Sequence, residues 1–196
     1  MNYVEAHDNL TFWDKLALSM PGAPSEVMLS CDKLGAAMVL LSQGIPFMQA
    51  GQEFLRSKPL PNGGFVHDSY NSPDSINSLK WYQATLHRDT VDYCRGLIAI
   101  RRKFPEFRLP TADLIREKLR FDDRDDGVLL MRLGKDLLFV INPLGHEIEI
   151  DAVGDVYADK QRASDKPLYR IQGKYPCAPR GIMLIHLSKP VAEENA

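Results

Sequence analysis

The residues best equipped for chemistry lie near the start of the chain, where His7, Asp8 and Asn9 follow one another. Their side chains offer hydrogen-bond donors and acceptors, and the Asp8 carboxylate alone provides two acceptor oxygens. Such groups are costly to bury without partners, but they suit the binding of sugar hydroxyls. Trp13 follows closely, and an aromatic ring is a good platform for a sugar ring. By residue type alone, a His-Asp pair at a strand end is more often a structural hydrogen-bonded pair than a catalytic one.

A second polar group lies in residues 70–77, which read YNSPDSIN and include Asp74 and Asn77. By composition this is a turn-rich loop whose Asp and Asn could cap the following helix. The alternative is a loop whose side chains contact a substrate. For Gln52 and Glu53, which follow a short apolar segment, a structural hydrogen-bonding role is favoured over a catalytic one.

The elements that must position these residues form one strand, helix, strand unit. Residues 2–6 are predicted to be a strand, and residues 25–43 a helix with Ser25 as N-cap and an apolar face repeating every three or four residues. Gly44 and Pro46 end this helix, and residues 45–50 form a second strand, parallel to the first. Residues 51–81 form a long irregular loop, and residues 89–104 a further helix ending before a proline.

The second half of the chain has a different character. Residues 127–133, 137–142, 146–151 and 181–187 are predicted strands, separated by turn signals such as Gly134-Lys135-Asp136. This pattern favours an antiparallel β-sandwich. We place the domain boundary near residues 110–120, giving domains 1–112 and 113–196, and we expect the tail 190–196 to be frayed.

Composition excludes several functional classes. The formal net charge is −2, which suggests neither nucleic acid nor an anionic membrane as a partner. The chain has no membrane-length apolar run and no signal-peptide pattern at its start. Cys31, Cys94 and Cys177 are odd in number and widely spaced, as expected for reduced thiols in a cytoplasmic protein. The acidic run 122–126 lacks the glycine and distal glutamate of an EF-hand and indicates a polar turn, so no metal or cofactor is predicted.

Four segments resemble the type I pullulanases, which are debranching enzymes of the α-amylase family of glycoside hydrolases. NYVEAHDNLTFWDK (2–15) resembles the fourth conserved region of that family, and SQGIPFMQAGQEFLRSK (42–58) resembles the eighth barrel strand. DSYNSPDSINSLKW (68–81) resembles the loop after that strand, and VDYCRGLIAIRRKFPEFRL (91–109) the last barrel helix. The resemblance implies an α/β plus all-β chain: the last two βα units of a (β/α)₈ barrel followed by an antiparallel β-sandwich domain.

The resemblance also implies roles for the polar residues. Asp8 matches the carboxylate that stabilises the transition state during cleavage of α-1,6-glucosidic branch linkages in pullulan, glycogen or limit dextrins. His7 and Asn9 would hold hydroxyls of the sugars flanking the cleaved bond, and Asp74 and Asn77 would lie in a substrate-side loop.

The nucleophile and the general acid/base of the family have no match in this sequence, so we expect a C-terminal portion that is inactive alone. Its partners would be an α-glucan and the missing N-terminal part of the barrel. Two alternatives are a non-catalytic glucan-binding module and one half of a split debranching enzyme, such as an isoamylase-like protein.

Overall fold

The computed structural model describes residues 1–122 and 124–188. The chain divides into an N-terminal unit, Met1–Arg95, and a C-terminal unit, Gly96–Ala196, and the division falls inside helix α5 (Arg88–Lys103). The predicted boundary between residues 112 and 113 stays a prediction. Asp123 of the acidic run and the tail 190–196 lie outside the described residues.

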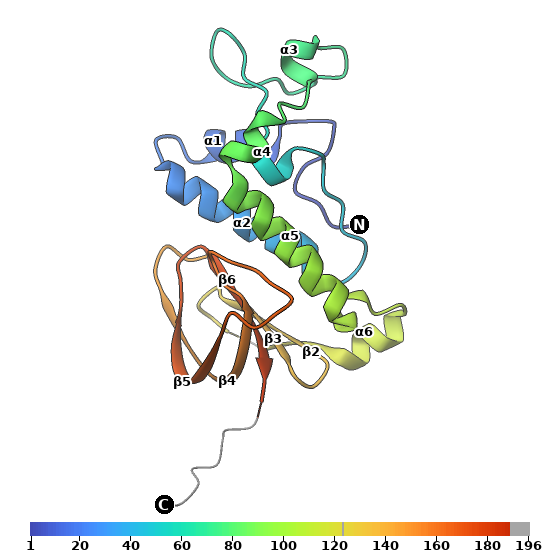
Figure 1. Ribbon diagram of the computed structural model, residues 1–196, viewed down its shortest axis with the longest axis vertical. Helices are drawn as coiled ribbons and strands as arrows, with labels where there is room; N and C mark the ends of the chain where they lie inside the picture. Colours follow the sequence, from blue (N-terminus) through green and yellow to red (C-terminus); the bar gives the residue numbers. More distant parts are fainter. Residues whose placement is uncertain (123, 189–196) are drawn as a thin grey trace, which may run out of the picture. The chain divides into compact units, whose positions relative to one another are not determined.

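Helices dominate the N-terminal unit, and α1 packs on α2 (Figure 1). Their sequence is α1 (Phe12–Ser19), α2 (Ser25–Leu40), the 3₁₀ helix η1 (Gln52–Phe54), α3 (Asp74–Asn77), α4 (Tyr82–Leu86) and α5 (Arg88–Lys103). The structure confirms the two long predicted helices to within a few residues. At the start of α2, however, Pro24 rather than Ser25 occupies the N-cap position, and no side chain caps the helix.

The two predicted parallel strands of this unit are reduced to one parallel bridge. Asn2 N–H donates to the Ile45 carbonyl at 2.9 Å, and Phe47 N–H donates to the Asn2 carbonyl at 2.8 Å. Asn2 and Pro46 therefore pair in the predicted direction, but residues 2–6 and 45–50 do not form regular strands. The physical reason is that an isolated pair of strands is only marginally stable in water, and no third strand pairs with either segment within the described residues.

The described part of the C-terminal unit contains η2 (Pro105–Arg108), α6 (Ala112–Lys118) and six strands in a single antiparallel sheet. The strands are β1 (Leu119–Asp122), β2 (Leu129–Leu133), β3 (Leu137–Asn142), β4 (Ile148–Ala158), β5 (Tyr169–Cys177) and β6 (Gly181–Leu187). Their order is β1-β2-β3-β6-β4-β5. All six strands pair within one sheet, so the predicted two-sheet sandwich is not confirmed.

The sheet is curved, and the paired strands β4 and β5 bend together along their length (Figure 1). The register of β4 against β6 shifts between Val156 and Ala158, which marks a bulge. At Gly154 an added Cβ would lie 2.4 Å from the His186 carbonyl oxygen of β6, so only glycine allows this close approach. The core beneath the sheet contains the fully buried side chains of Val140, Val156 and Ile185.

The side chain of Asn142, at the end of β3, forms hydrogen bonds that connect neighbouring elements at one end of the sheet. It is fully buried, and its Nδ2 donates to the carbonyls of His146, Cys177 and Ala178 at 3.0–3.1 Å. Its Oδ1 accepts the Leu144 N–H at 3.1 Å. One amide side chain therefore joins the β3–β4 connection to the end of β5.

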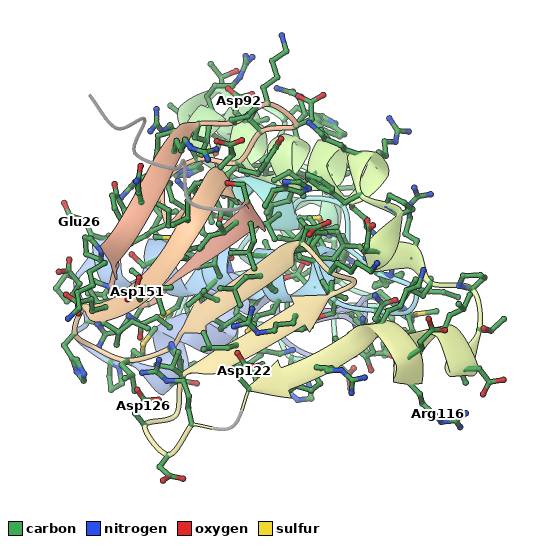
Figure 2. The ribbon with its side chains drawn as sticks, turned by 90° about the horizontal axis from the view of Figure 1, so that it is seen from below. Glu26, Asp92, Arg116, Asp122, Asp126 and Asp151 are labelled. Carbon is green, nitrogen blue, oxygen red and sulfur yellow. The ribbon has the colours of Figure 1, made fainter. Side chains whose placement is uncertain are left out.

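Charged side chains gather at the periphery of the C-terminal unit. Asp122 and Asp126 lie at the β1–β2 connection (Figure 2), and each is paired with an arginine, Arg132 and Arg124 respectively. The described part of the acidic run is thus a polar turn with local ion pairs.

Cys31, Cys94 and Cys177 form no disulfide with one another. Cys94 and Cys177 are buried and Cys31 is half-buried. None of the helices in the described residues combines the length and apolar character needed to cross a membrane.

Candidate functional site

His7, Asp8 and Asn9 lie on the surface of the N-terminal unit. The side chains of His7 and Asp8 are 81% and 75% exposed, and His7 Nε2 lies 3.5 Å from Asp8 Oδ2. Asn9 has a left-handed backbone (φ 70°), which asparagine tolerates better than most residues, and its Oδ1 accepts the Leu10 N–H at 2.8 Å. The Asp8 carboxylate is therefore open to a ligand rather than sealed in a core.

Two partly buried hydrogen bonds join the segment before the tripeptide to the helix after it. Upstream, Glu5 is 1% exposed, and its Oε2 accepts the Phe12 N–H at the start of α1. Downstream, Lys15 Nζ donates to the Val4 carbonyl at 2.9 Å. The short loop that carries residues 7–9 is thus anchored at both ends to α1, so that its backbone is fixed while its side chains remain accessible.

Glu5 has an unusual electrostatic environment. Burial raises its pKa from 4.5 to about 7, more than the Phe12 N–H and nearby cations lower it. Asp32 of α2 is also buried, and burial together with the Glu5 charge raises its pKa to about 8. Neither carboxylate oxygen of Asp32 accepts a hydrogen bond from the described residues. Asp32 therefore favours the protonated form at neutral pH, whereas Glu5 titrates close to neutral pH.

The loop after the parallel bridge is tied to α1 through Asp14. This carboxylate is fully buried, and it accepts the Ser57 hydroxyl at 2.5 Å and the Lys58 N–H at 2.9 Å. Lys58 is itself 2% exposed, and its Nζ donates to Ser69 Oγ at 2.6 Å. Asp14 and Lys58 thus bring residues 57–69 to the helix that follows His7, Asp8 and Asn9.

Asn77 and Asp74 differ in their surroundings. Asn77 Nδ2 donates to the carbonyls of Ser69 and Ser72, and the Asn77 carbonyl accepts a bond from Arg56. Its side-chain amide nitrogen is therefore engaged in fixing the loop. Asp74 is exposed at the first position of α3. No hydrogen bond or ion pair between described residues joins either of them to His7, Asp8 or Asn9.

Sequence reasoning missed the buried supporting residues Glu5, Asp14 and Lys58. Glu5 lies within the quoted motif but looks like an ordinary polar strand residue, and Asp14 and Lys58 are separated by 44 positions. The expected structural role of Glu53 agrees with its contact, because Glu53 Oε2 accepts the Gly51 N–H at 2.9 Å.

Comparisons with known proteins place the chain among the pullulanases. No protein-family profile matches it. It is 41% identical over 133 residues to the pullulanase of Bacillus subtilis (strain 168), a match that covers 68% of this chain and 18% of that protein. The solved structure of the Bacillus acidopullulyticus pullulanase superposes with a TM-score of 0.86 at 29% identity, covering 94% of this chain and 24% of that one.

The type I pullulanase of Bacillus subtilis, solved in complex with maltose, superposes with a TM-score of 0.83 at 30% identity, over 95% of this chain and 27% of that one. The chain spans less than a fifth of the length of the curated pullulanases first matched, which it covers to 18% and 12%. By sequence and by structure, the chain belongs with the type I pullulanases and matches a C-terminal portion of them.

Proposed function

We propose that this chain supplies the transition-state-stabilising carboxylate, Asp8, to a retaining glycosidase that cleaves α-1,6-glucosidic branch linkages in pullulan, glycogen or limit dextrins. The observation that carries the proposal is the open Asp8 carboxylate, 75% exposed on a loop held by hydrogen bonds to α1, in a chain that matches pullulanases. A fixed but accessible carboxylate is what binding of sugar hydroxyls requires.

The proposed chemistry follows from the acceptor capacity of Asp8. Its two oxygens accept hydrogen bonds from neighbouring hydroxyls of the sugar at the cleaved bond. These bonds strengthen as the ring flattens toward an oxocarbenium ion, and an interaction that is stronger in the transition state raises the rate. His7 and Asn9 bind hydroxyls of the flanking sugars, and Asp74 contacts a sugar further from the cleaved bond. Asn77 shapes the same loop through its bonds to Ser69 and Ser72.

Two further carboxylates, about 5 Å apart, are needed for retaining hydrolysis, and we propose that another part of the parent barrel provides them. In this proposal residues 1–112 are the last two βα units of the (β/α)₈ barrel. Support comes from the parallel Asn2–Pro46 bridge, which has α1 and α2 between its two segments. The isolated chain is then inactive on pullulan.

The surface around this bridge supports the same interpretation. Tyr3 is 57% exposed, Ile45 68% and Phe47 37%, and the rings of Tyr3 and Phe47 touch with centroids 6.1 Å apart. A hollow of about 390 Å³ lies beside them, lined by residues that include Met1 and Met38. Grouped exposed apolar side chains mark a contact surface. The occupant we propose is the preceding part of the barrel, whose strands would pair with the open backbone edges.

A chimera tests the proposal directly. This chain replaces the matched C-terminal portion of the Bacillus subtilis pullulanase, and reducing-sugar release from pullulan is measured. We expect activity in the chimera, none in the isolated chain, and a loss of about 10²–10³ in kcat for Asp8→Asn, the range found when one transition-state contact is removed. Glu149→Gln, which removes an exposed carboxylate of the C-terminal unit, is the matched control. Equal activity of the Asp8→Asn and Glu149→Gln chimeras would contradict the role of Asp8.

The exposed apolar surface also favours a second candidate, one half of a split debranching enzyme. Co-expression with a separate N-terminal barrel chain distinguishes the two, because only a split enzyme gives a co-purifying, active pair without fusion. A cytoplasmic location, expected from the reduced cysteines, belongs to the same proposal.

A further inference from the structure

The C-terminal unit contains a hollow that the proposed chemistry of Asp8 does not use. Its volume is about 240 Å³, and it opens where the ends of β4 and β5 approach the start of β6. Apolar side chains, among them Ile182 and Met183, line part of it. The polar lining consists of Glu147, Asp159, Lys160, Gln161, Tyr169 and Tyr175.

The curvature of the sheet creates this hollow. A straight strand of the length of β4 would extend about 36 Å, at about 3.3 Å per residue. Yet Glu147, just before β4, and Asp159, just after it, line the same space. The bulge between Val156 and Ala158 and the left-handed Gly173 of β5 (φ 87°) bend the two strands. The hollow is thus formed by the curved strands together with the connections that carry Glu147 and residues 159–161.

The polar groups of the hollow are organised in advance. Asp159 accepts the N–H groups of Gln161 and Arg162, both at 2.8 Å, which fixes the turn after β4. The Tyr169 phenol is hydrogen-bonded to Asp159 and Tyr175, and the two tyrosine rings lie 5.5 Å apart between centroids. Burial raises the pKa of Tyr169 well above its usual range, so the phenol stays protonated and remains a donor.

The base of the hollow is equally fixed. Asn142 donates to the carbonyls of His146, next to Glu147, and Ala178, which lines the hollow. A site whose groups are already held in place loses little freedom when a ligand binds. Rigid backbone on both sides of Glu147 therefore favours recognition of a ligand with a defined shape.

The chemistry of the lining selects the class of ligand. Carboxylates and phenols accept, while the Lys160 ammonium, the Gln161 amide and the phenols donate. This mixture fits a neutral molecule with many hydroxyl groups better than a strongly charged one. The aromatic and apolar part of the lining suits the C–H face of a pyranose. The volume lies below the range of about 300–1,000 Å³ typical of drug-sized ligands, and so fits one or two sugar rings.

We propose that this hollow is a saccharide-binding site that holds a short α-glucan segment through Glu147, Gln161 and Tyr175, independently of Asp8. The choice of an α-glucan among saccharides rests on the proposed function. The site would keep a polymeric substrate attached to the protein while other sugars of the same chain are cleaved elsewhere.

Titration of the full chain with maltotriose, followed by ¹H–¹⁵N NMR, tests the site. We expect saturable shifts at residues 147, 160–161 and 175. Glu147→Gln and Gln161→Ala should weaken this binding at least about fivefold, because each removes a hydrogen-bonding group from the contact. Both residues are exposed, so neither change threatens the fold. Tyr175→Phe keeps the packing of the ring and should weaken binding about threefold or more.

Glu149→Gln is the matched control, because Glu149 is an exposed carboxylate two residues after Glu147 that pairs with Lys174 at 2.7 Å and does not line the hollow. Equal effects of Glu149→Gln and Glu147→Gln would overturn the site, as would the absence of saturable shifts at about 10 mM maltotriose. Shifts that persist at residues 147 and 161 in Asp8→Asn would support it. If the shifts at residues 147 and 161 disappeared in Asp8→Asn, the two sites would not be independent, but the proposed role of Asp8 would be unaffected.

Discussion

Replacing Asn142 with aspartate tests how strongly one buried amide holds the C-terminal unit together. The substitution conserves shape but puts an oxygen where Nδ2 donates to the carbonyls of His146, Cys177 and Ala178. An amide nitrogen has two protons, so two donated bonds are lost and three carbonyls face an oxygen. At about 1–2 kcal/mol for each lost bond to a buried group, the free energy of unfolding should fall by about 2–4 kcal/mol.

Unfolding in urea measures this loss, and the two units can be distinguished. Both tryptophans, Trp13 and Trp81, lie in the N-terminal unit, so tryptophan fluorescence reports that unit. Far-UV circular dichroism follows both units, and the part of its transition that fluorescence does not show reports the C-terminal unit. With a slope of about 1.5 kcal/mol per molar urea, the midpoint should fall by about 1–3 M. The tryptophan transition should stay unchanged.

The pH dependence of the variant adds an independent check. A buried carboxyl that faces carbonyl oxygens has its pKa raised by folding, so its ionised form destabilises the fold. The deficit of Asn142→Asp should therefore be largest above the folded pKa and should shrink as the pH falls, because the protonated acid regains one donor. Asn62→Asp, at an exposed loop position, is the control. A midpoint shift no larger than that of Asn62→Asp would refute the reasoning.

Three further substitutions probe other features. The raised pKa of Glu5 makes the stability of the wild-type N-terminal unit fall as the pH rises from 4.5 to about 7, so Glu5→Gln should reduce this pH dependence. Tryptophan-detected urea unfolding at pH 5 and 8 measures it, and the same pH dependence in the variant and the wild type would contradict the reasoning. Gly154→Ala should destabilise the sheet by about 1–3 kcal/mol through overlap with the His186 carbonyl, whereas Gly145→Ala, which meets only the mobile end of Arg180, should cost less in the same denaturation assay. Ile45→Glu should reduce self-association of the isolated chain, because Ile45 is 68% exposed beside Tyr3 and Phe47, and unchanged light scattering would count against that surface.

The sequence predicted best those elements whose burial is uniform along their length. β3, from Leu137 to Asn142, is buried at every position, and its apolar run predicts a strand with correct ends. The apolar run of β6, which is buried except at its last two residues, also predicts a strand with correct ends. β5 was missed although its exposed residues alternate regularly with buried or half-buried ones, because Gly173 and Pro176 look like turn signals.

The candidate site was only partly predictable, for a physical reason. His7, Asp8 and Asn9 form one local motif, so the sequence alone can single them out as candidates, and their roles stay predictions. The groups that support them act across long separations, as in the bond from Lys58 N–H to Asp14, and periodicity carries no information about such pairs. Asn77 was hard to assign for a different reason. Its residue type suits a ligand-binding role, but its side-chain amide nitrogen donates to the backbone carbonyls of Ser69 and Ser72.

Each unit contains a buried cysteine whose rate of alkylation reports how often that unit opens. Burial raises the pKa of Cys94, in the N-terminal unit, and of Cys177, in the C-terminal unit, to about 12, so neither is a reactive thiolate in the closed fold. Alkylation of either sulfur therefore waits for its own surroundings to open. Measuring the two alkylation rates by mass spectrometry would show which unit opens locally more often, without any engineered label.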